Sequence, residues 1–202
     1  MKRIFDIFFS LTSIVMLSPV LVIIYLIIRC DGGPGFFAQT RIGLNGRRFR
    51  MLKFRSMCVD AEQRKQELLK FNEKSDGITF KITDDPRITR IGRLLRRTSL
   101  DELPQLINVL MGDMSIVGPR PCLPDEMECY SNEYCGRFSV KPGLTCLWQV
   151  GEKNGGLLEV SDRNSIGLDE QIRLDLDYAR DISIFRDIWI ILKTIPALFF
   201  GK

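Results

Sequence analysis

The chain has 202 residues, a net charge of +4 and no histidine. Its length is sufficient for one domain with a substantial core. The lack of histidine excludes a Ser-His-Asp or Cys-His nucleophile system and a histidine-ligated zinc site. Any acid–base chemistry near neutral pH must therefore use carboxylates, lysine, tyrosine or cysteine.

The beginning of the chain is strongly apolar. Residues 7–28 carry no charge, and as a helix they would extend about 33 Å, close to the hydrocarbon thickness of a bilayer. Ser18 and Pro19 lie inside this run, where the proline removes a helical hydrogen bond and favours a sharp bend. Basic residues flank the run on both sides, although positive charge normally marks one side of a membrane. The residues alone leave a spanning helix and a re-entrant helix equally open.

Two later segments concentrate positive charge. Residues 41–55 contain six basic side chains and residues 87–97 contain five, and neither segment contains an acid. Such segments suit anionic lipid headgroups or phosphorylated substrates. Nucleic acid is not an expected partner, because the chain has no recognisable nucleic-acid-binding motif. The cysteines match no zinc-site spacing, which favours free thiols.

The hydrophobic periodicity predicts a small β-hairpin followed mainly by helices. The last apolar stretch, residues 182–200, also contains charges, which suits a helix lying in a membrane interface; a core helix is the alternative. The other expected elements are, in chain order, strands at 36–42 and 47–57 around a turn at 43–46, a polar helix at 60–71, a loop at 74–85 with or without a short strand at 78–82, a helix with Ile88, Ile91, Leu94 and Leu95 on one face, a helix at 103–111, a strand at 115–117 and a helix at 168–179.

The predicted chemical centre is the segment TSLDELP at residues 98–104. Ser99 and Glu102 have the spacing of a capping box, and acids in a first helical turn are favoured by the helix dipole, so a structural role explains both. Yet five basic residues directly precede the segment. Carboxylates beside arginines also suit a site for phosphate and a divalent metal, in which a carboxylate binds Mg²⁺ or acts as the nucleophile. Asp101 and Glu102 would point in different directions and would not duplicate one role.

A second candidate lies at Gly118-Pro119-Arg120-Pro121. Each proline fixes its own φ angle and biases the preceding residue towards an extended conformation. Arg120 is therefore expected on a stiff loop, where its guanidinium could grip a phosphate through two hydrogen bonds.

These residues belong to a series of ordered motifs that resembles the bacterial sugar transferases, the monotopic phosphoglycosyl transferases that begin glycoconjugate assembly on a polyprenyl phosphate. The resemblance covers essentially the whole chain and corresponds to the catalytic module alone. The motifs that carry it are KFRSM at 53–57, DDPRITR at 84–90, the segments 98–106 and 112–121, PGLT at 142–145, LWQV at 147–150, Ser18-Pro19, and LKTIP at 192–196.

The resemblance implies an α+β, mainly helical fold in a monotopic membrane protein. Residues 1–30 would form a re-entrant membrane helix broken at Ser18 and Pro19. Residues 31–202 would form the catalytic domain, with a small β-hairpin and interfacial amphipathic helices, on the cytoplasmic face of the bacterial inner membrane. The expected partners are a UDP-sugar, polyprenyl (undecaprenyl) phosphate and membrane phospholipid.

The implied reaction transfers a sugar-1-phosphate to polyprenyl phosphate and releases UMP, as the first membrane step of exopolysaccharide, capsule, O-antigen or glycoprotein glycan assembly. Asp101 would be the nucleophile, holding the phospho-sugar covalently, and would also bind the Mg²⁺ cofactor. Glu102 would assist as a base or by positioning the acceptor. The remaining implied site residues are Arg96, Arg120 and Arg163 for phosphate, and Pro119, Pro121, Trp148 and Gln149 in the substrate loop.

The chain departs from the family pattern near its sugar-facing region. Cys146 stands where glycine is usual. Residues 151–160 read as an insertion, which assigns the family's phosphate-contact arginine to Arg163; in the alternative alignment Lys153 takes that role. The sequence names neither the sugar nor the pathway, and it does not decide whether the chain forms a homodimer.

Two other functions remain open on the residues alone. One is a non-catalytic, membrane-docked scaffold that binds anionic lipid through the arginine-rich segments. The other is a phosphate-transfer enzyme acting on a different lipid.

Overall fold

The computed structural model describes residues 1–72, 82, 84–150, 152–153, 156–157 and 166–200. The described strands pair two by two: β1 (Phe36–Ile42) with β2 (Arg48–Phe54), β3 (Ser115–Val117) with β4 (Gly143–Thr145), and β5 (Glu152–Lys153) with β6 (Gly156–Leu157). The α-helices are α1 (Lys2–Arg29), α2 (Ala61–Leu68), α3 (Arg90–Arg97), α4 (Gln105–Met111), α5 (Pro124–Glu128), α6 (Leu168–Arg180) and α7 (Ile184–Phe200). Single 3-10 turns or short 3-10 helices are η1 (Leu44–Gly46), η2 (Leu69–Phe71), η3 (Leu100–Glu102), η4 (Asn132–Ser139) and η5 (Trp148–Val150).

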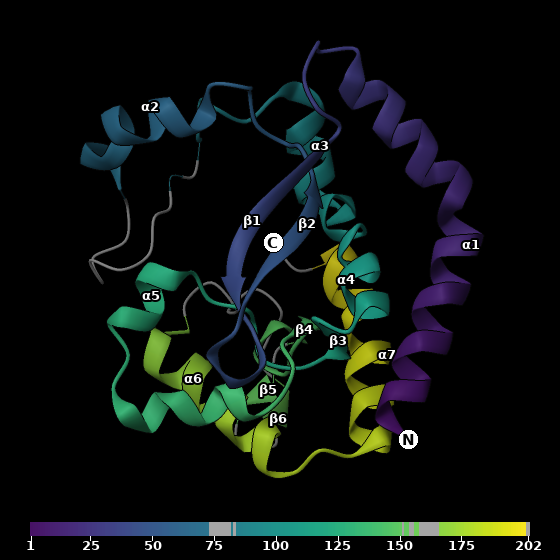
Figure 1. Ribbon diagram of the computed structural model, residues 1–202, viewed down its shortest axis with the longest axis vertical. Coiled ribbons are helices and arrows are strands. Elements are labelled where there is room, and N and C mark those ends of the chain that lie inside the picture. Colours follow the sequence, from purple (N-terminus) through teal and green to yellow (C-terminus); the bar gives the residue numbers. More distant parts are fainter. Residues whose placement is uncertain (73–81, 83, 151, 154–155, 158–165, 201–202) are drawn as a thin grey trace.

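The molecule is mainly helical around small sheets, in agreement with the expected α+β class. Helix α1 runs along one side, the β1–β2 hairpin crosses the centre, and α2, α5 and α6 lie on the other side (Figure 1). The main hydrophobic core gathers buried side chains from β2, α4, β3, η5, α6 and α7. The expected strand at 78–82 lies outside the described residues, apart from residue 82.

The β1–β2 hairpin forms as predicted, because an alternating pair of strands flanks a turn that tolerates left-handed residues. The antiparallel register runs from Phe36 opposite Phe54 to Ile42 opposite Arg48. Asn45 and Gly46 have φ angles of 54° and 74°, a conformation that asparagine and glycine adopt readily. The second strand ends at residue 54 rather than 57, because the chain then turns to pack against α3.

Helix α1 continues through the expected break. Pro19 lies inside the helix and lacks the N–H that would bond the Val15 carbonyl, but the Ser18 hydroxyl donates to that carbonyl at 2.8 Å. The helix is therefore not interrupted at Ser18 and Pro19, and the prediction of a break there is wrong. The helix instead bows around the molecule, with its middle furthest out (Figure 1).

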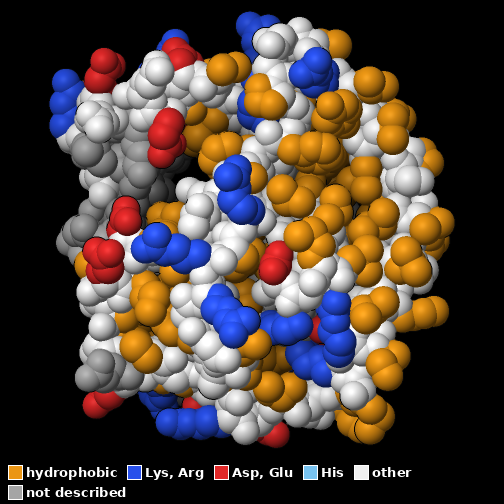
Figure 2. All heavy atoms as spheres, in the orientation of Figure 1, with side chains coloured by type: hydrophobic (Ala, Val, Ile, Leu, Met, Phe, Trp, Pro, Cys, Tyr) orange, Lys and Arg blue, Asp and Glu red, His pale blue; other side chains and the backbone are white. Residues whose placement is uncertain are grey.

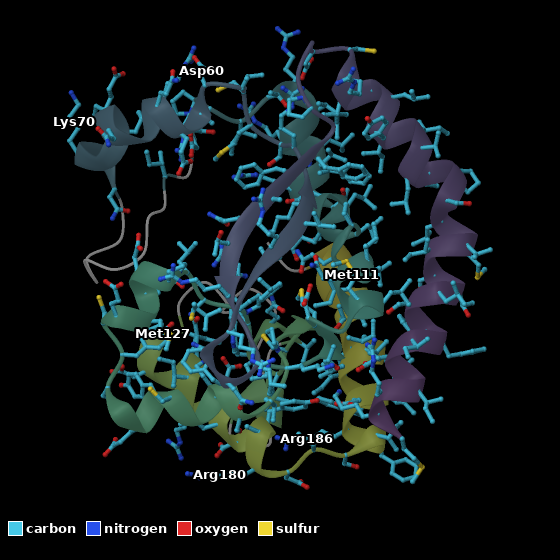
Figure 3. The ribbon with its side chains drawn as sticks, in the orientation of Figure 1. Asp60, Lys70, Met111, Met127, Arg180 and Arg186 are labelled. Carbon is cyan, nitrogen blue, oxygen red and sulfur yellow. The ribbon has the colours of Figure 1, made fainter. Side chains whose placement is uncertain are left out.

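The first turns of α1 are fixed to the globular part by polar contacts. The Lys2 ammonium lies 2.5 Å from the Asp187 carboxylate of α7. The buried Asp6 carboxylate accepts hydrogen bonds from the Ser115 hydroxyl at 2.9 Å and the Ile116 N–H at 3.1 Å. Arg180 and Arg186, labelled in Figure 3, mark the turn between α6 and α7 at this same end of the molecule.

The last turns of α1 also contact the globular part, here through apolar packing. Ile24 and Ile28 are buried in a cluster with Phe54 of β2 and Leu95 of α3. Both ends of α1 are thus attached to one body, whereas most side chains between them are exposed.

Exposed apolar side chains gather along α1. It is the one helix among the described residues that is long and apolar enough to cross a membrane, with a mean hydropathy of 2.6 over its best window, of which 11% is buried. Figure 2 shows this apolar surface along the α1 side of the molecule, with lysine and arginine side chains nearer the middle. Helix α7 has a buried side, as the core-helix alternative predicted, and an exposed apolar residue: Ile190 is fully buried in the core, whereas Phe185 is 81% exposed.

Parts of the second half of the chain are joined by contacts between distant residues. Strands β3 and β4 pair in parallel, and this pairing was not predicted from the sequence. The buried Arg137 of η4 forms an ion pair with the buried Asp175 of α6 and donates a hydrogen bond to the Arg120 carbonyl at 2.9 Å. All six cysteines are free thiols, as expected.

Candidate active site

The carboxylates of Asp101 and Glu102 lie on η3, between α3 and α4. The capping-box interpretation is wrong. Ser99 has a φ of 54° and its hydroxyl caps no N–H, while the Glu102 carboxylate bonds the Lys53 ammonium of β2 at 2.6 Å. Helix α4 begins only at residue 105. A left-handed conformation costs a serine about 1–2 kcal/mol, so local strain is stored directly before the two acids.

Asp101 is a buried carboxylate without a close counter-ion in the part of the chain that the structure describes. It is 7% exposed and forms no ion pair with any described residue. Burial raises the pKa of Asp101, and the negative charge of Glu102 adds to this effect. The positive charges of Lys53 and Arg96 act in the opposite direction without cancelling it.

Glu102 has the opposite electrostatic environment. Burial alone would raise the pKa of Glu102, but the charges of Lys53, Arg120 and Arg41 hold that pKa below its usual range. The pKa values of the two neighbouring acids are therefore shifted in opposite directions. This agrees with the expectation that the two residues do not duplicate one role. Glu102 is firmly ionised at neutral pH, whereas Asp101 is an ionisable group kept in a poorly solvated position.

Arg96 is aimed by the contact between α3 and the segment that follows β2. Its Nε donates to the Ser56 hydroxyl at 2.9 Å. Helix α3 can lie this close because Gly92 packs directly on the Ser56 backbone, where a Cβ would overlap the carbonyl oxygen. Thr89 caps the helix by accepting from the Gly92 N–H at 3.0 Å. Arg96 is thereby held near enough to influence the charge of Asp101.

The Pro119-Arg120-Pro121 loop is fixed as expected. The Gly143 N–H donates to the Pro119 carbonyl at 2.9 Å, and Arg41 donates to the Pro121 carbonyl at 3.1 Å. The exposed Arg120 guanidinium lies 5.9 Å from the centre of the buried Trp148 ring. The Trp148 ring is therefore shielded from solvent and makes a cation–π contact with the Arg120 guanidinium.

These elements line a small pocket that is partly open to solvent. We call it the Arg41 pocket. It brings together four of the predicted site residues, namely Glu102, Arg120, Pro121 and Gln149. Asp101 and Arg96 do not line it, although Asp101 is adjacent to Glu102 in the chain. Arg163 lies outside the described residues, and the structure describes only the backbone of Lys153 in β5.

Sequence reasoning gave no site role to two cations of the pocket, Arg41 and Lys53. Both come from the hairpin, and a signal for them existed. In the register of the hairpin, Gln39 is opposite Met51 and Arg41 is opposite Phe49. Side chains two positions apart share a face, so Arg41, Met51 and Lys53 point to the same side, whereas Arg48 and Arg50 point to the other.

The carboxylates of the site fit Mg²⁺ better than a metal that needs a full set of protein ligands. The described residues bring no three histidine, cysteine, aspartate or glutamate side chains together. Mg²⁺ commonly uses one or two protein carboxylates and completes its coordination with substrate phosphates and water. Asp101 is the suitable donor, because Glu102 is already bonded to Lys53.

Comparison with known proteins decides the family. The family model described as bacterial sugar transferase matches residues 1–201. The chain belongs to the bacterial sugar transferase family. This agrees with the resemblance carried by the sequence motifs.

Relatives in this family span different lengths. The chain is 46% identical over 200 residues to the galactosyl transferase CpsE of Streptococcus agalactiae, covering 99% of this chain and 42% of that protein. It is 39% identical to the exopolysaccharide production protein ExoY of Sinorhizobium fredii, covering 98% of this chain and 84% of that one. A third sugar transferase, UDP-glucose:undecaprenyl-phosphate glucose-1-phosphate transferase of Caulobacter vibrioides, is 38% identical, covering 98% and 69%. The chain spans about two fifths of the length of CpsE and of several other relatives.

Proposed function

We propose that this chain transfers a sugar-1-phosphate from a UDP-sugar to polyprenyl phosphate and releases UMP. The observation that carries the proposal is Asp101, a buried carboxylate without an ion-pair partner among the described residues, whose pKa is influenced by the charges of Lys53, Glu102 and Arg96. Family membership supports this reaction, as does the similarity to the UDP-glucose:undecaprenyl-phosphate glucose-1-phosphate transferase of Caulobacter vibrioides. The relatives include both galactosyl and glucosyl enzymes, so the sugar is left to experiment.

The proposed reaction has two displacements at one phosphorus atom. In the first, an Asp101 carboxylate oxygen attacks the sugar-proximal phosphorus, the bond to the bridging oxygen breaks, and UMP leaves with that oxygen. In the second, a phosphate oxygen of polyprenyl phosphate attacks the same phosphorus and the bond to Asp101 breaks. The products are polyprenyl-diphospho-sugar and the regenerated carboxylate. A poorly solvated carboxylate is a stronger nucleophile than one in water.

The other residues of the site act on charge and position. Arg96 and Arg120 offset the negative charge of the substrate phosphates. Glu102, ionised and held by Lys53, orients the acceptor phosphate or takes a proton from it. Mg²⁺, held by Asp101 and the phosphates, would supply further charge neutralisation.

The covalent step is tested by replacing Asp101 with asparagine. Purified full-length protein is screened for Mg²⁺-dependent UMP release across a panel of UDP-sugars, and the active sugar is then used with a radiolabelled β-phosphate. We expect wild-type protein, without acceptor, to carry a hydroxylamine-labile label. Asp101→Asn should carry none and lose roughly 10³-fold or more of the rate. Asp125→Asn, at an exposed position on α5, is the matched control.

The same experiment separates the reaction from a scaffold role. A lipid-binding scaffold would lose nothing when Asp101 becomes asparagine. Undiminished UMP release by Asp101→Asn would reject the nucleophile assignment. Wild-type protein that releases no UMP from any UDP-sugar, yet binds anionic vesicles, would favour the scaffold.

The proposal also includes a membrane arrangement, in which the middle of α1 enters one leaflet of the inner membrane and both ends stay on the cytoplasmic face. A straight helix of this length would extend about 42 Å and separate its ends by a bilayer. Support comes from the contacts of both ends with one body, through Lys2 and Asp6 at the start and Ile24 and Ile28 at the end.

Cysteine labelling tests this arrangement. Cys30 is exposed at the end of α1. A variant keeping it as the sole exposed thiol is compared with one whose sole exposed thiol is placed before Lys2. A membrane-impermeant maleimide should label both variants in inside-out vesicles and neither in intact spheroplasts. Labelling of the two positions from opposite sides would establish a spanning helix instead.

A further inference from the structure

The Arg41 pocket contains more positive charge than its own acids balance. Arg41, Lys53 and Arg120 line it together with one carboxylate, Glu102. Lys53 is bonded to that carboxylate. Neither Arg41 nor Arg120 forms an ion pair with any residue that the structure describes. Two guanidinium groups are thus held in one pocket without a matching anion from the described part of the chain.

Arg41 is also fixed in an orientation that leaves its Nε donor unused. One terminal nitrogen donates to the Pro121 carbonyl at 3.1 Å and the other to the Gln39 side-chain oxygen at 2.8 Å. Its Nε is buried and has no hydrogen-bond partner among the described residues. Burial, reinforced by the neighbouring charge of Arg120, lowers the pKa of Arg41. A buried unpaired donor beside a like charge is costly unless an anion arrives.

We propose that Arg41 is a substrate-contact residue that, together with Arg120, binds the phosphate leaving with the nucleotide. The inference rests on the proposed function and deepens it, because it assigns the two phosphates of the UDP-sugar to opposite sides of η3. Asp101 and Arg96 take the sugar-proximal phosphate, which is attacked. The Arg41 pocket takes the other phosphate, and Glu102 at its lining serves the acceptor phosphate only in the second displacement, after UMP has left.

The place of the pocket in the fold favours the nucleotide over the lipid acceptor. Its lining residues come from the hairpin, η3, α4 and the loops around residues 120, 143 and 149, with no residue of α1 among them. Arg96, by contrast, follows Leu95, which packs on Ile24 and Ile28 of α1. A polyprenyl chain that approaches along the apolar side of α1 therefore reaches the Arg96 side first. The pocket on the other side is left for the water-soluble half of the donor.

Neutralising Arg41 tests the assignment. Arg41→Gln and Arg41→Lys are made in the full-length chain, with Arg173→Gln as the matched control, because Arg173 is exposed on α6 outside both basic segments. UMP binding is measured by calorimetry with Mg²⁺ present, and the KM values for UDP-sugar and for polyprenyl phosphate are measured separately. We expect Arg41→Gln to weaken UMP binding and raise the UDP-sugar KM by about 10- to 100-fold, the usual effect of losing a charge-assisted contact to phosphate. The acceptor KM should stay within about twofold, and Arg41→Lys should recover part of the UMP affinity.

A purely structural Arg41 gives a different pattern. If Arg41 only braces the Pro121 loop, Arg41→Gln lowers the melting temperature while UMP binding by the folded fraction stays at the wild-type value, which overturns the assignment. A rise in the acceptor KM alone also overturns it, since the pocket would then serve the lipid. Wild-type protein that binds UMP in an Arg41-dependent way but never releases UMP from a UDP-sugar would refute the proposed reaction and leave the binding assignment intact.

Discussion

At the scale of single residues, the site depends on giving two adjacent acids different surroundings. Asp101 and Glu102 occupy consecutive positions of a 3-10 turn, where side chains diverge by about 120°. One is desolvated and unpaired within the described chain, and the other is bonded to Lys53. Lys53 lowers the pKa of both groups, so its charge sets the pH range over which the site is ionised.

Removing the charge of Lys53 should raise the lowest pH at which Asp101 is ionised and the site is active. A nucleophilic carboxylate works in its ionised form, so activity falls as pH drops through the pKa of Asp101. In Lys53→Met this pKa rises, and the acidic limb of the kcat/KM profile for UMP release should move to higher pH. The loss should be several-fold larger at pH 6 than at pH 8. Lys70→Met, on the exposed η2 turn, should lose nothing; an equal loss at both pH values would contradict the prediction.

The buried charge of Asp101 should also reduce the stability of the fold. Burial raises the pKa of Asp101 in the folded state. The folded protein therefore binds a proton at Asp101 more tightly than the unfolded chain does. The protonated Asp101 carboxyl group contributes its full stabilisation at pH values below its pKa in the unfolded chain. This stabilisation is lost as the pH rises through its pKa in the folded protein. Asp101→Asn should therefore have a higher melting temperature than wild type at pH 7.5, and the difference should shrink at pH 4.5. A lower melting temperature at pH 7.5 would show that the ionised carboxylate is stabilising.

At the scale of elements, local sequence patterns predicted the helices and strands well. They did not predict the contacts between residues that are far apart in the sequence. The hairpin and β3 follow from residue alternation and turn chemistry, so their positions were predictable. The capping box failed because Ser99 is left-handed and Glu102 bonds Lys53, 49 residues away. Asp101 and Arg120 were candidates from the residues alone, and the resemblance to the family supplied the roles expected of them. The role of Arg41 was missed because it depends on which face of the hairpin meets the Pro121 loop.

The contact between α3 and residue 56 is the clearest element-level dependence of the site. Gly92→Ala would place a methyl group against the Ser56 carbonyl oxygen. The resulting overlap should cost about 1–3 kcal/mol of unfolding free energy and separate Arg96 from the Ser56 hydroxyl. Thermal unfolding and the rate of UMP release should both fall. Gly167→Ala is the control, since a Cβ there meets nothing within 4 Å; equal behaviour of the two variants would rule out the close packing.

At the scale of the whole molecule, α1 is integrated with the rest of the chain by residues more than 100 positions apart. Asp6 is buried and accepts hydrogen bonds from both Ser115 and Ile116. An apolar run of this kind predicts a membrane helix from its composition alone. It cannot predict where the helix is attached, because the partners of Asp6 lie on a strand that is close only in the folded chain.

Asp6→Ala should therefore destabilise a region remote in sequence. The substitution leaves the Ser115 hydroxyl and the Ile116 N–H unpaired in a buried position, at a cost of about 1–3 kcal/mol. Hydrogen exchange at β3 should accelerate by roughly tenfold or more. Asp125→Ala, on the surface of α5, should change stability by less than about 0.5 kcal/mol. Unchanged exchange at β3 in Asp6→Ala would mean that the hydrogen bonds of Asp6 do not stabilise this strand.

The attachment of α1 near both of its ends has a mechanical consequence for the proposed membrane arrangement. A globular domain that is joined to a membrane helix at one flexible end can rotate about that end. Its active site then lies at a variable distance from the membrane surface. A body fastened near residues 2–6 and again near residues 24–28 is restrained against rocking along the line that joins the two fastenings. If the outer bow of α1 enters one leaflet as proposed, the chain itself would set the height of Asp101 above the lipid phosphates, and the two proposed substrates would meet at a constant depth.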